Sequence, residues 1–176
     1  MYTTAPEIET ERLTLRAHRR GDHADITAMW SDPQVVRHIG GRPFTAEECW
    51  ARLLRYVGHW VVMGYGFWAV LERASGRFVG DVGFAELKRD IDPALGDVPE
   101  AGWVLAPWAH GKGFATEAMQ AALAWTERTT GATETVCIID VGNAASIRVA
   151  TKLGYRERLR TTYKGDAAIV LDRRRV

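Results

Sequence analysis

The chain of 176 residues has little cysteine, almost no net charge and no long apolar run. Its two cysteines, Cys49 and Cys137, lie far apart and lack the spacing of a metal site, which indicates reduced thiols in the core. A net charge of +1 provides no general attraction to nucleic acid or to an anionic membrane surface. No apolar segment approaches the roughly 20 residues that span a bilayer, and the first residues do not resemble a secretion signal. We therefore expect a cytoplasmic protein that binds no metal, nucleic acid or membrane.

The order of strands and helices predicts an α/β protein with one mixed sheet. A chain of this length fits a single domain, residues 1–176. The early strands follow one another through turns and the later ones alternate with helices, so the sheet should be antiparallel first and parallel across the helix that begins at Gly113. About six to seven strands and about four helices are expected. The expected strands are 13–17, 66–72, 77–87, 99–105, 133–140, 155–163 and 167–172, and the expected helices are 21–31, 45–64, 113–128 and 143–153.

Residue types that favour a start or a stop mark the boundaries of two early helices. Thr45 and Glu48 have the spacing of a capping box, and Gly64 can end the helix that they begin. The Asp32-Pro33 pair is expected to break the preceding helix. One apolar face of the 45–64 helix should join the core, and so should four tryptophans. The face comprises Trp50, Leu53, Leu54, Val57, Trp60 and Val61, and the tryptophans are Trp50, Trp60, Trp68 and Trp125.

Two glycines one residue apart, Gly111 and Gly113, lie between an apolar strand that ends at Leu105 and an amphipathic helix. The first N–H groups of a helix have no partner within the helix and lie at the positive end of its dipole, so they stabilise an anion. Glycine carries no Cβ that would keep a diphosphate away from these donors. The segment therefore predicts a phosphate-holding loop.

A second segment with strong boundary signals begins at Asn143. Asn143 is suited to cap a helix, Ile147, Ala150 and Leu153 form an apolar stripe, and Gly154 can adopt the left-handed conformation that ends a helix. This pattern predicts a short helix directly after a buried strand.

Together the two segments resemble the GNAT superfamily of N-acetyltransferases. Residues 107–118 are similar to its coenzyme A pyrophosphate loop, whose pattern is Arg/Gln-x-x-Gly-x-Gly/Ala. Residues 143–155 resemble the Asn-x-x-Ala/Ser…Lys-Leu-Gly-Phe/Tyr segment of the subgroup that acetylates the N-terminal alanine or serine of ribosomal proteins. Residues 8–16 look like the opening strand of that subgroup and residues 100–105 like its central strand, so the resemblance extends over nearly the whole chain.

The resemblance implies the GNAT fold and an acetyl-CoA-dependent N-acetyltransferase. In that fold the central strands, here 99–105 and 133–140, splay apart at one end and admit the pantetheine arm of the coenzyme. A primary amine of a protein N-terminus or a small molecule attacks the acetyl group directly in a ternary complex, in a monomer or a homodimer. His110 stands where the family usually has Arg or Gln, and Ala150 where many relatives have a tyrosine acid. These departures motivate an alternative, a non-catalytic acyl-CoA-binding module with the same fold.

The same resemblance supplies candidate site residues. A free amine is mostly protonated at neutral pH, so a general base is useful. Glu100 matches a glutamate common at the start of the family's central strand and is the expected base, with Gly102 leaving space beside it; Asp81 and water are the alternatives. Ser146 is expected to donate a hydrogen bond to the leaving thiolate. The residues expected to bind the coenzyme are Trp103, Val104, Leu105, His110, Gly111, Lys112, Gly113, Phe114, Ala115, Thr116, Asn143 and Ser146.

Four aromatic residues come from segments that wall the acceptor pocket in the family: Trp30, Phe44, Trp50 and Tyr65. A flat aromatic pocket without an acidic cluster suits a small or peptidic amine better than a highly cationic aminoglycoside or polyamine.

Overall fold

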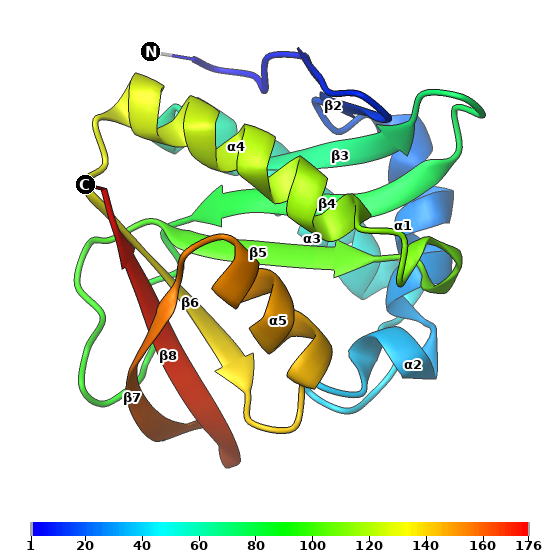
Figure 1. Ribbon diagram of the computed structural model, residues 1–176. Helices are drawn as coiled ribbons and strands as arrows, with labels where there is room; N and C mark the ends of the chain where they lie inside the picture. The colour runs from blue at the N-terminus through cyan, green and yellow to red at the C-terminus, as the bar shows by residue number, and fades with distance from the viewer. Residues whose placement is uncertain (1, 176) are drawn as a thin grey trace.

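The computed structural model describes residues 2–175. Within them, eight strands form one mixed sheet in the order β1-β2-β3-β4-β5-β6-β8-β7, flanked by five α-helices (Figure 1). Consecutive strands from β1 to β5 pair antiparallel, β6 runs parallel to β5, and β8 lies between β6 and β7, antiparallel to both. The strands are β1 (Ile8–Glu9), β2 (Leu13–Arg16), β3 (Phe67–Glu72), β4 (Phe78–Ala85), β5 (Glu100–Leu105), β6 (Glu134–Asp140), β7 (Arg156–Tyr163) and β8 (Asp166–Arg174), and the helices are α1 (His23–Trp30), α2 (Pro33–Val36), α3 (Ala46–Met63), α4 (Phe114–Thr130) and α5 (Ala144–Lys152).

The mixed α/β class and the change from antiparallel to parallel pairing are confirmed, but the sheet has more strands than predicted. Residues 8–16 form a hairpin rather than one opening strand. The N–H of Thr10 donates to the carbonyl of Leu13 at 2.9 Å and closes the turn between β1 and β2. A strand of two residues is too short to show an alternating pattern in the sequence.

The additional helix is α2, which begins where the sequence predicts only a break. Proline fits the first position of a helix, where its missing N–H would have no partner in any case. Asp32 caps this helix by accepting a hydrogen bond from the N–H of Gln34 at 2.8 Å. The Asp32-Pro33 pair therefore ends α1 and starts α2.

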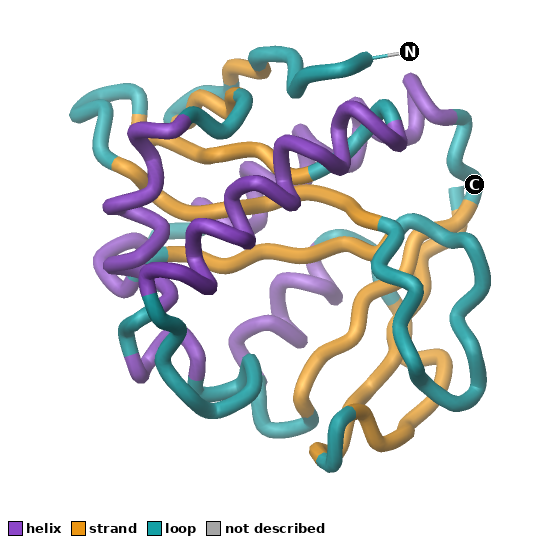
Figure 2. The backbone as a smooth tube through the Cα atoms, turned by 180° about the vertical axis from the view of Figure 1, so that it is seen from behind, coloured by secondary structure: helices purple, strands orange, loops and turns teal. Residues whose placement is uncertain are grey.

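Helices cover both faces of the sheet. Helices α4 and α5 lie on the face toward the viewer in Figure 1, and α3 lies on the opposite face, which Figure 2 shows from behind, with α1 packed against it. Among the described residues, no helix is both long and apolar enough to cross a membrane.

Helix α3 has the predicted ends, but its buried face is rotated from the predicted one. Thr45 and Glu48 form the capping box, and Gly64 adopts φ 74° at the C-terminal end. The buried residues are Cys49, Leu53, Tyr56 and Trp60, whereas Trp50, Leu54, Val57 and Val61 are exposed. The apolar residues span more of the helix circumference than the sheet and α1 cover, so one edge of the stripe faces solvent.

Three of the four tryptophans assigned to the core are buried there. The rings of Trp60, Trp68 and Trp125 pack edge to face, with centroids 4.8 to 5.3 Å apart. Trp50 is 36% exposed, so its assignment to the core is wrong.

Candidate active site

Strands β5 and β6 are joined at one end only. The ladder between them contains a single residue pair, Glu100 with Val136, and beyond it the two strands diverge (Figure 1). On its other side, β5 is paired with β4 from Glu100 to Leu105. The edge of β5 that faces β6 therefore presents backbone N–H and C=O groups without a strand partner among the described residues. This is the splayed geometry that the family resemblance implies.

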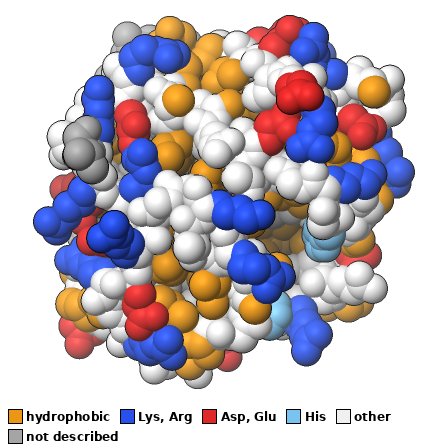
Figure 3. Space-filling model, in the orientation of Figure 1, with side chains coloured by type: hydrophobic (Ala, Val, Ile, Leu, Met, Phe, Trp, Pro, Cys, Tyr) orange, Lys and Arg blue, Asp and Glu red, His pale blue; other side chains and the backbone are white. Residues whose placement is uncertain are grey.

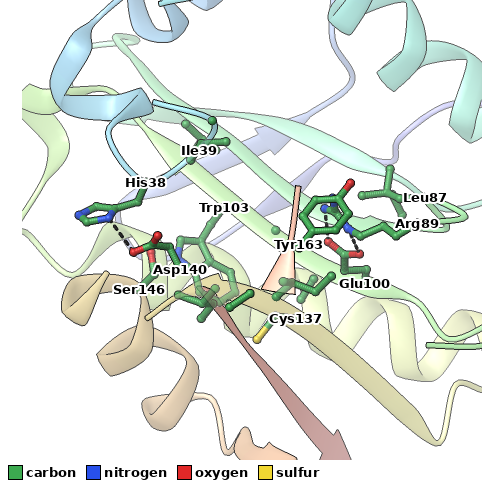
Figure 4. A pocket seen from close by; sticks show the side chains of 18 of the residues that line it. His38, Ile39, Leu87, Arg89, Glu100, Trp103, Cys137, Asp140, Ser146 and Tyr163 are labelled. Atoms are coloured by element: carbon green, nitrogen blue, oxygen red, sulfur yellow. Dashed lines mark hydrogen bonds and ion pairs between the residues drawn. The ribbon is translucent and has the colours of Figure 1, made fainter. Parts of the chain in front are cut away.

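A cavity of about 680 Å³ occupies this split. Its wall includes β5, β6, the start of α5, part of α3 and the turn between β7 and β8. Glu100 and Ser146, the two predicted catalytic residues, both line it, and so do Trp103, Val104 and Asn143. In the view of Figure 4, Glu100 and Ser146 lie toward opposite ends of the cavity.

The glycine loop has the backbone conformation that an anion site at the start of α4 requires. Gly111 and Gly113 adopt left-handed φ values of 74° and 81°, and Gly113 is the N-cap of α4. No side chain of the described residues caps this helix end, so the N–H groups of the first turn are available. A Cβ at Gly111 would meet no atom within 4 Å, which shows open space beside the loop. These features fit a diphosphate.

The hairpin of β1 and β2 clamps this loop. Arg12 donates from Nη1 to the carbonyl of Lys112 at 3.0 Å and from Nε to Glu117 in the first turn of α4 at 2.7 Å. The hydroxyl of Thr10 donates to the same carboxylate at 2.6 Å. Arg12, whose charge is paired with Glu117, thus anchors the loop to the hairpin, a contact that the sequence did not predict. Figure 3 shows basic side chains bordering a hollow with apolar walls on this face of the molecule.

His110 braces the loop against the end of β5. Its Nε2 lies 2.9 Å from the carbonyl oxygen of Leu105, so this nitrogen carries the proton and donates. Leu105 and Phe114 are buried below the loop, whereas Ala115 and Thr116 are half-buried in the first turn of α4. None of these residues lines the cavity, which begins further along the split.

Helix α5 presents Ser146 to the cavity. The side chain of Asn143 accepts a hydrogen bond from the N–H of Ser146 at 3.1 Å, which confirms Asn143 as the helix cap. Ser146 is half-buried, and among residues 2–175 its hydroxyl has no hydrogen-bond partner. The hydroxyl is therefore available to a ligand.

Glu100 lies at the closed end of the split in an ion pair with Arg89. Arg89 donates from Nε to one carboxylate oxygen at 2.6 Å and from Nη2 to the other, and its guanidinium lies 4.9 Å from the ring centroid of Tyr163. Burial alone would lower the pKa of Arg89, but the pairing with Glu100 outweighs burial, so the pKa of Arg89 is raised. Glu100 is 8% exposed, so Arg89 and the cavity are its main surroundings.

The space expected beside Gly102 is filled. A Cβ on Gly102 would lie 2.7 Å from Cζ of Phe67, so the absent side chain admits the Phe67 ring rather than a substrate. Glycine is needed here for packing, and the prediction of open space is wrong.

Asp81, the alternative base, lies outside the cavity wall. It is fully buried, with one oxygen 2.9 Å from Nε2 of His18 and the other accepting from Nε1 of Trp30 at 3.2 Å. Glu100 is also buried and paired, but it lines the cavity, where an incoming amine can reach it, and Asp81 does not. The structure therefore favours Glu100 over Asp81.

Two of the four predicted acceptor-pocket aromatics line the cavity. Trp30 and Phe44 do, with ring centroids 5.0 Å apart. Trp50 instead packs edge-on against His23 at the start of α1. Tyr65 is buried and packs edge-on against His59. Trp50 differs from the prediction because α3 buries a different face from the one that the sequence pattern indicates. Tyr65 follows α3 and belongs to the core.

Several residues of the cavity wall were missed by sequence reasoning. Arg89 lies in a segment whose composition indicates only a loop, and His38 lies in the turn after α2, where its Nδ1 is 2.9 Å from Oδ1 of Asp140. Tyr56 belongs to the buried stripe of α3 and Arg52 lies one turn before it, and this spacing is the one signal that could have placed Arg52 beside the stripe.

Both cysteines are free and buried, as predicted. Cys137 lines the cavity, and burial together with the charge of Glu100 raises the pKa of its thiol. The thiol therefore stays protonated and is a poor nucleophile. The cavity offers the acetyl group no activated cysteine at this position.

Residues 12–156 match the family model described as an acetyltransferase (GNAT) domain. The putative GnaT-family acetyltransferase from Bordetella pertussis is 32% identical, with a TM-score of 0.84 over 96% of this chain and 99% of that one. Two solved structures of lower identity share the fold. Spermidine N-acetyltransferase from Vibrio cholerae, in complex with CoA and spermine, is 18% identical, with a TM-score of 0.73 over 94% and 96% of the two chains. The Salmonella typhimurium enzyme that modifies the N-terminal serine of 50S ribosomal subunit protein L7/L12 is 16% identical, with a TM-score of 0.78 over 97% and 100%. The chain therefore belongs to the GNAT family and is an N-acetyltransferase that uses acetyl-CoA as its cosubstrate.

Proposed function

We propose that this protein transfers the acetyl group of acetyl-CoA to a primary amine at the split between β5 and β6. The observation that carries the proposal is the single residue pair that joins these strands, because it opens the sheet into a cavity lined by Glu100 and Ser146. The amine attacks the thioester directly while both substrates are bound, and residues 1–176 act as one domain. A cytoplasmic location remains a prediction.

The proposed acceptor is a protein N-terminus or a small amine of low positive charge. The Salmonella enzyme modifies an N-terminal serine, and the Vibrio enzyme is named for spermidine. In this chain, Trp30, Phe44 and Arg52 line the cavity on the side of α3. An aromatic and basic wall repels a polycation, so a polyamine is disfavoured.

The proposed coenzyme site combines the glycine loop with the open edge of β5. The diphosphate binds the free N–H groups at the start of α4, beside Gly111, Gly113 and the charge of Arg12. The pantetheine arm, which contains amide groups, follows the unpaired edge of β5 past Trp103 and Val104.

Glu100 and Ser146 divide the proposed chemistry between them. The ammonium of the acceptor loses a proton to Glu100, directly or through water, while Arg89 holds the carboxylate in place. The amine nitrogen then forms a bond to the acetyl carbon, the carbon–sulfur bond breaks, and the second proton of the nitrogen passes to water or to the departing thiolate. Ser146 donates a hydrogen bond to the departing thiolate, which has an ordinary thiol pKa of about 8.5 and needs no strong acid.

A panel of amines tests the proposal. Purified protein is mixed with acetyl-CoA and one amine at a time, and free thiol and the mass of the amine are both followed. The expected result is thiol release that depends on the amine and matches the amount of acetylated product. Tight coenzyme binding by calorimetry, with no acetylation of N-terminal peptides or small amines, would instead favour an acyl-CoA-binding module.

A further inference from the structure

Two arginines of α3, Arg52 and Arg55, line the cavity without an ion-pair partner among residues 2–175. Lys164 and Asp166 also belong to the wall and lie exposed at the turn between β7 and β8. The other charged side chains of the wall are engaged in pairs. These pairs are Arg42 with Glu48, Arg89 with Glu100, and His38 with Asp140. Within residues 2–175, the wall formed by α3 therefore carries two positive charges that no salt bridge pairs.

Arg52 is held so that a ligand can reach only part of its guanidinium. Its Cζ lies 3.7 Å from the ring centroid of Trp30 and 4.8 Å from that of Phe44. Its Nε is buried and has no hydrogen-bond partner among the described residues, and its Nη1 lies 3.5 Å from the hydroxyl of Tyr56. Aromatic stacking occupies the flat faces of a guanidinium and leaves the N–H groups of its edge as the available donors. A guanidinium that is partly removed from water and lacks a counter-ion favours binding of an anion.

The phosphates of the coenzyme are not this anion. The glycine loop that fits them lies at the start of α4, and α3 covers the opposite face of the sheet (Figures 1 and 2). An anion at Arg52 must therefore belong to the acceptor.

We propose that the acceptor amine also carries a carboxylate, which Arg52 binds through the N–H groups of its edge while Arg55 adds positive charge at the rim. This inference rests on the proposed acetyl transfer. A carboxylate matches the planar donor pair of a guanidinium in a bidentate hydrogen bond. The aromatic rings of Trp30 and Phe44 then cover the apolar part of the acceptor beside that carboxylate.

Two kinds of acceptor supply this chemistry, and matched pairs of substrates separate them. The first pair is an amino acid and its carboxamide. The second pair is two short peptide amides that differ only in Glu or Gln at the second position. The value of kcat/KM for each is measured at saturating acetyl-CoA with the native protein, Arg52→Met, Arg52→Lys and Arg128→Gln. Arg128 is exposed at the end of α4, so its substitution removes the same charge away from the cavity.

The native protein should prefer the carboxylate-bearing member of at least one pair by about tenfold or more in kcat/KM, mainly through KM. Arg52→Met should bring that ratio toward one, Arg52→Lys should retain part of it, and Arg128→Gln should retain all of it. Thermal unfolding shows whether each variant is folded. If Arg52→Met does not fold, Arg55→Gln replaces it in the test and should lower the ratio by a smaller factor.

Equal use of both members of both pairs by the native protein would overturn the inference, and so would an unchanged ratio in folded Arg52→Met. Failure of acetyl transfer itself is a different outcome, in which no amine is acetylated. In that case, calorimetry tests the anion site directly: an N-acetyl amino acid or its amide is titrated into the protein saturated with coenzyme A. Binding of the acid alone, lost in Arg52→Met, supports the anion site, and equal binding or no binding of the two contradicts it.

Discussion

Substitution of Glu100 tests the proposed proton transfer. It lies at the vertex of the split, faces the cavity, and has both oxygens oriented by Arg89. Replacing Glu100 with Gln preserves shape and removes the proton acceptor. We expect kcat to fall by about 10²-fold or more with coenzyme affinity unchanged, measured by thiol release and calorimetry.

Asp81→Asn is the comparison for this variant. Because Asp81 is buried against His18 and Trp30, its substitution should lower the free energy of unfolding by about 1–3 kcal/mol. A normal kcat in Glu100→Gln would show that water or another group accepts the proton.

Ser146 tests the other end of the reaction. Its hydroxyl has no partner among the described residues and lines the cavity, so its proposed role is to donate to the leaving thiolate. Ser146→Ala should lower kcat by about tenfold, the effect of one lost hydrogen bond, with little change in coenzyme affinity. Ser31→Ala, at the exposed C-terminal end of α1, is the matched control. Equal kcat in the two variants would remove Ser146 from the reaction.

At the scale of single elements, the two glycines at the ends of α4 test whether the start of this helix binds the coenzyme. Gly113 and Gly131 flank this helix, and both are left-handed, with φ 81° and 71°. Substitution of either glycine by Ala should lower the free energy of unfolding of the protein by about 1 kcal/mol. Only Gly113→Ala should also weaken coenzyme binding, by about tenfold, because only that glycine lies beside the proposed diphosphate. Equal coenzyme affinities in folded Gly113→Ala and Gly131→Ala would show that the loop does not bind the coenzyme.

The rotation of α3 leads to a second prediction on one element. Leu53 is 3% exposed and its neighbour Leu54 is 51% exposed, although the sequence pattern places both on the core face. Leu53→Ala should lower the free energy of unfolding by about 2–5 kcal/mol, and Leu54→Ala by less than about 1 kcal/mol. Chemical denaturation measures both values. Similar losses in the two variants would contradict the observed orientation of the helix.

These elements also show which features a sequence reveals. The capping box of Thr45 and Glu48 and the cap at Asn143 are predictable because their hydrogen bonds join residues close in sequence. The face that α3 buries depends on what packs against it, so a wide apolar stripe does not fix it. The second function of Pro33, starting α2, depends on the cap supplied by Asp32.

Across the whole molecule, the conformation of the glycine loop at the start of α4 could be predicted, and most of the partners in the cavity wall could not. The loop and the start of α5 are short continuous segments with the residue types that their hydrogen bonds require. The partners of the cavity come from distant segments, such as Arg89 for Glu100 and His38 for Asp140, and no local pattern links them. The pairing of β5 with β6 at one residue pair is likewise a property of the assembled sheet.

The split gives the proposed reaction two directions of approach. Trp30, Phe44 and Arg52 line the cavity from the side of α3, and Asn143 and Ser146 line it at the start of α5, which lies on the other face of the sheet (Figure 1). In the proposed reaction, the coenzyme and the amine are bound together, one from each side. The thiol of Cys137, whose pKa burial raises, offers no covalent route through this wall.

Initial rates measured while both acetyl-CoA and the acceptor amine are varied test this account most directly. If the amine attacks the thioester within a ternary complex at the split, double-reciprocal plots at several fixed concentrations of the second substrate give intersecting lines. Parallel lines would mean that the acetyl group first moves to the protein and the coenzyme leaves before the amine reacts, which contradicts the proposed direct transfer.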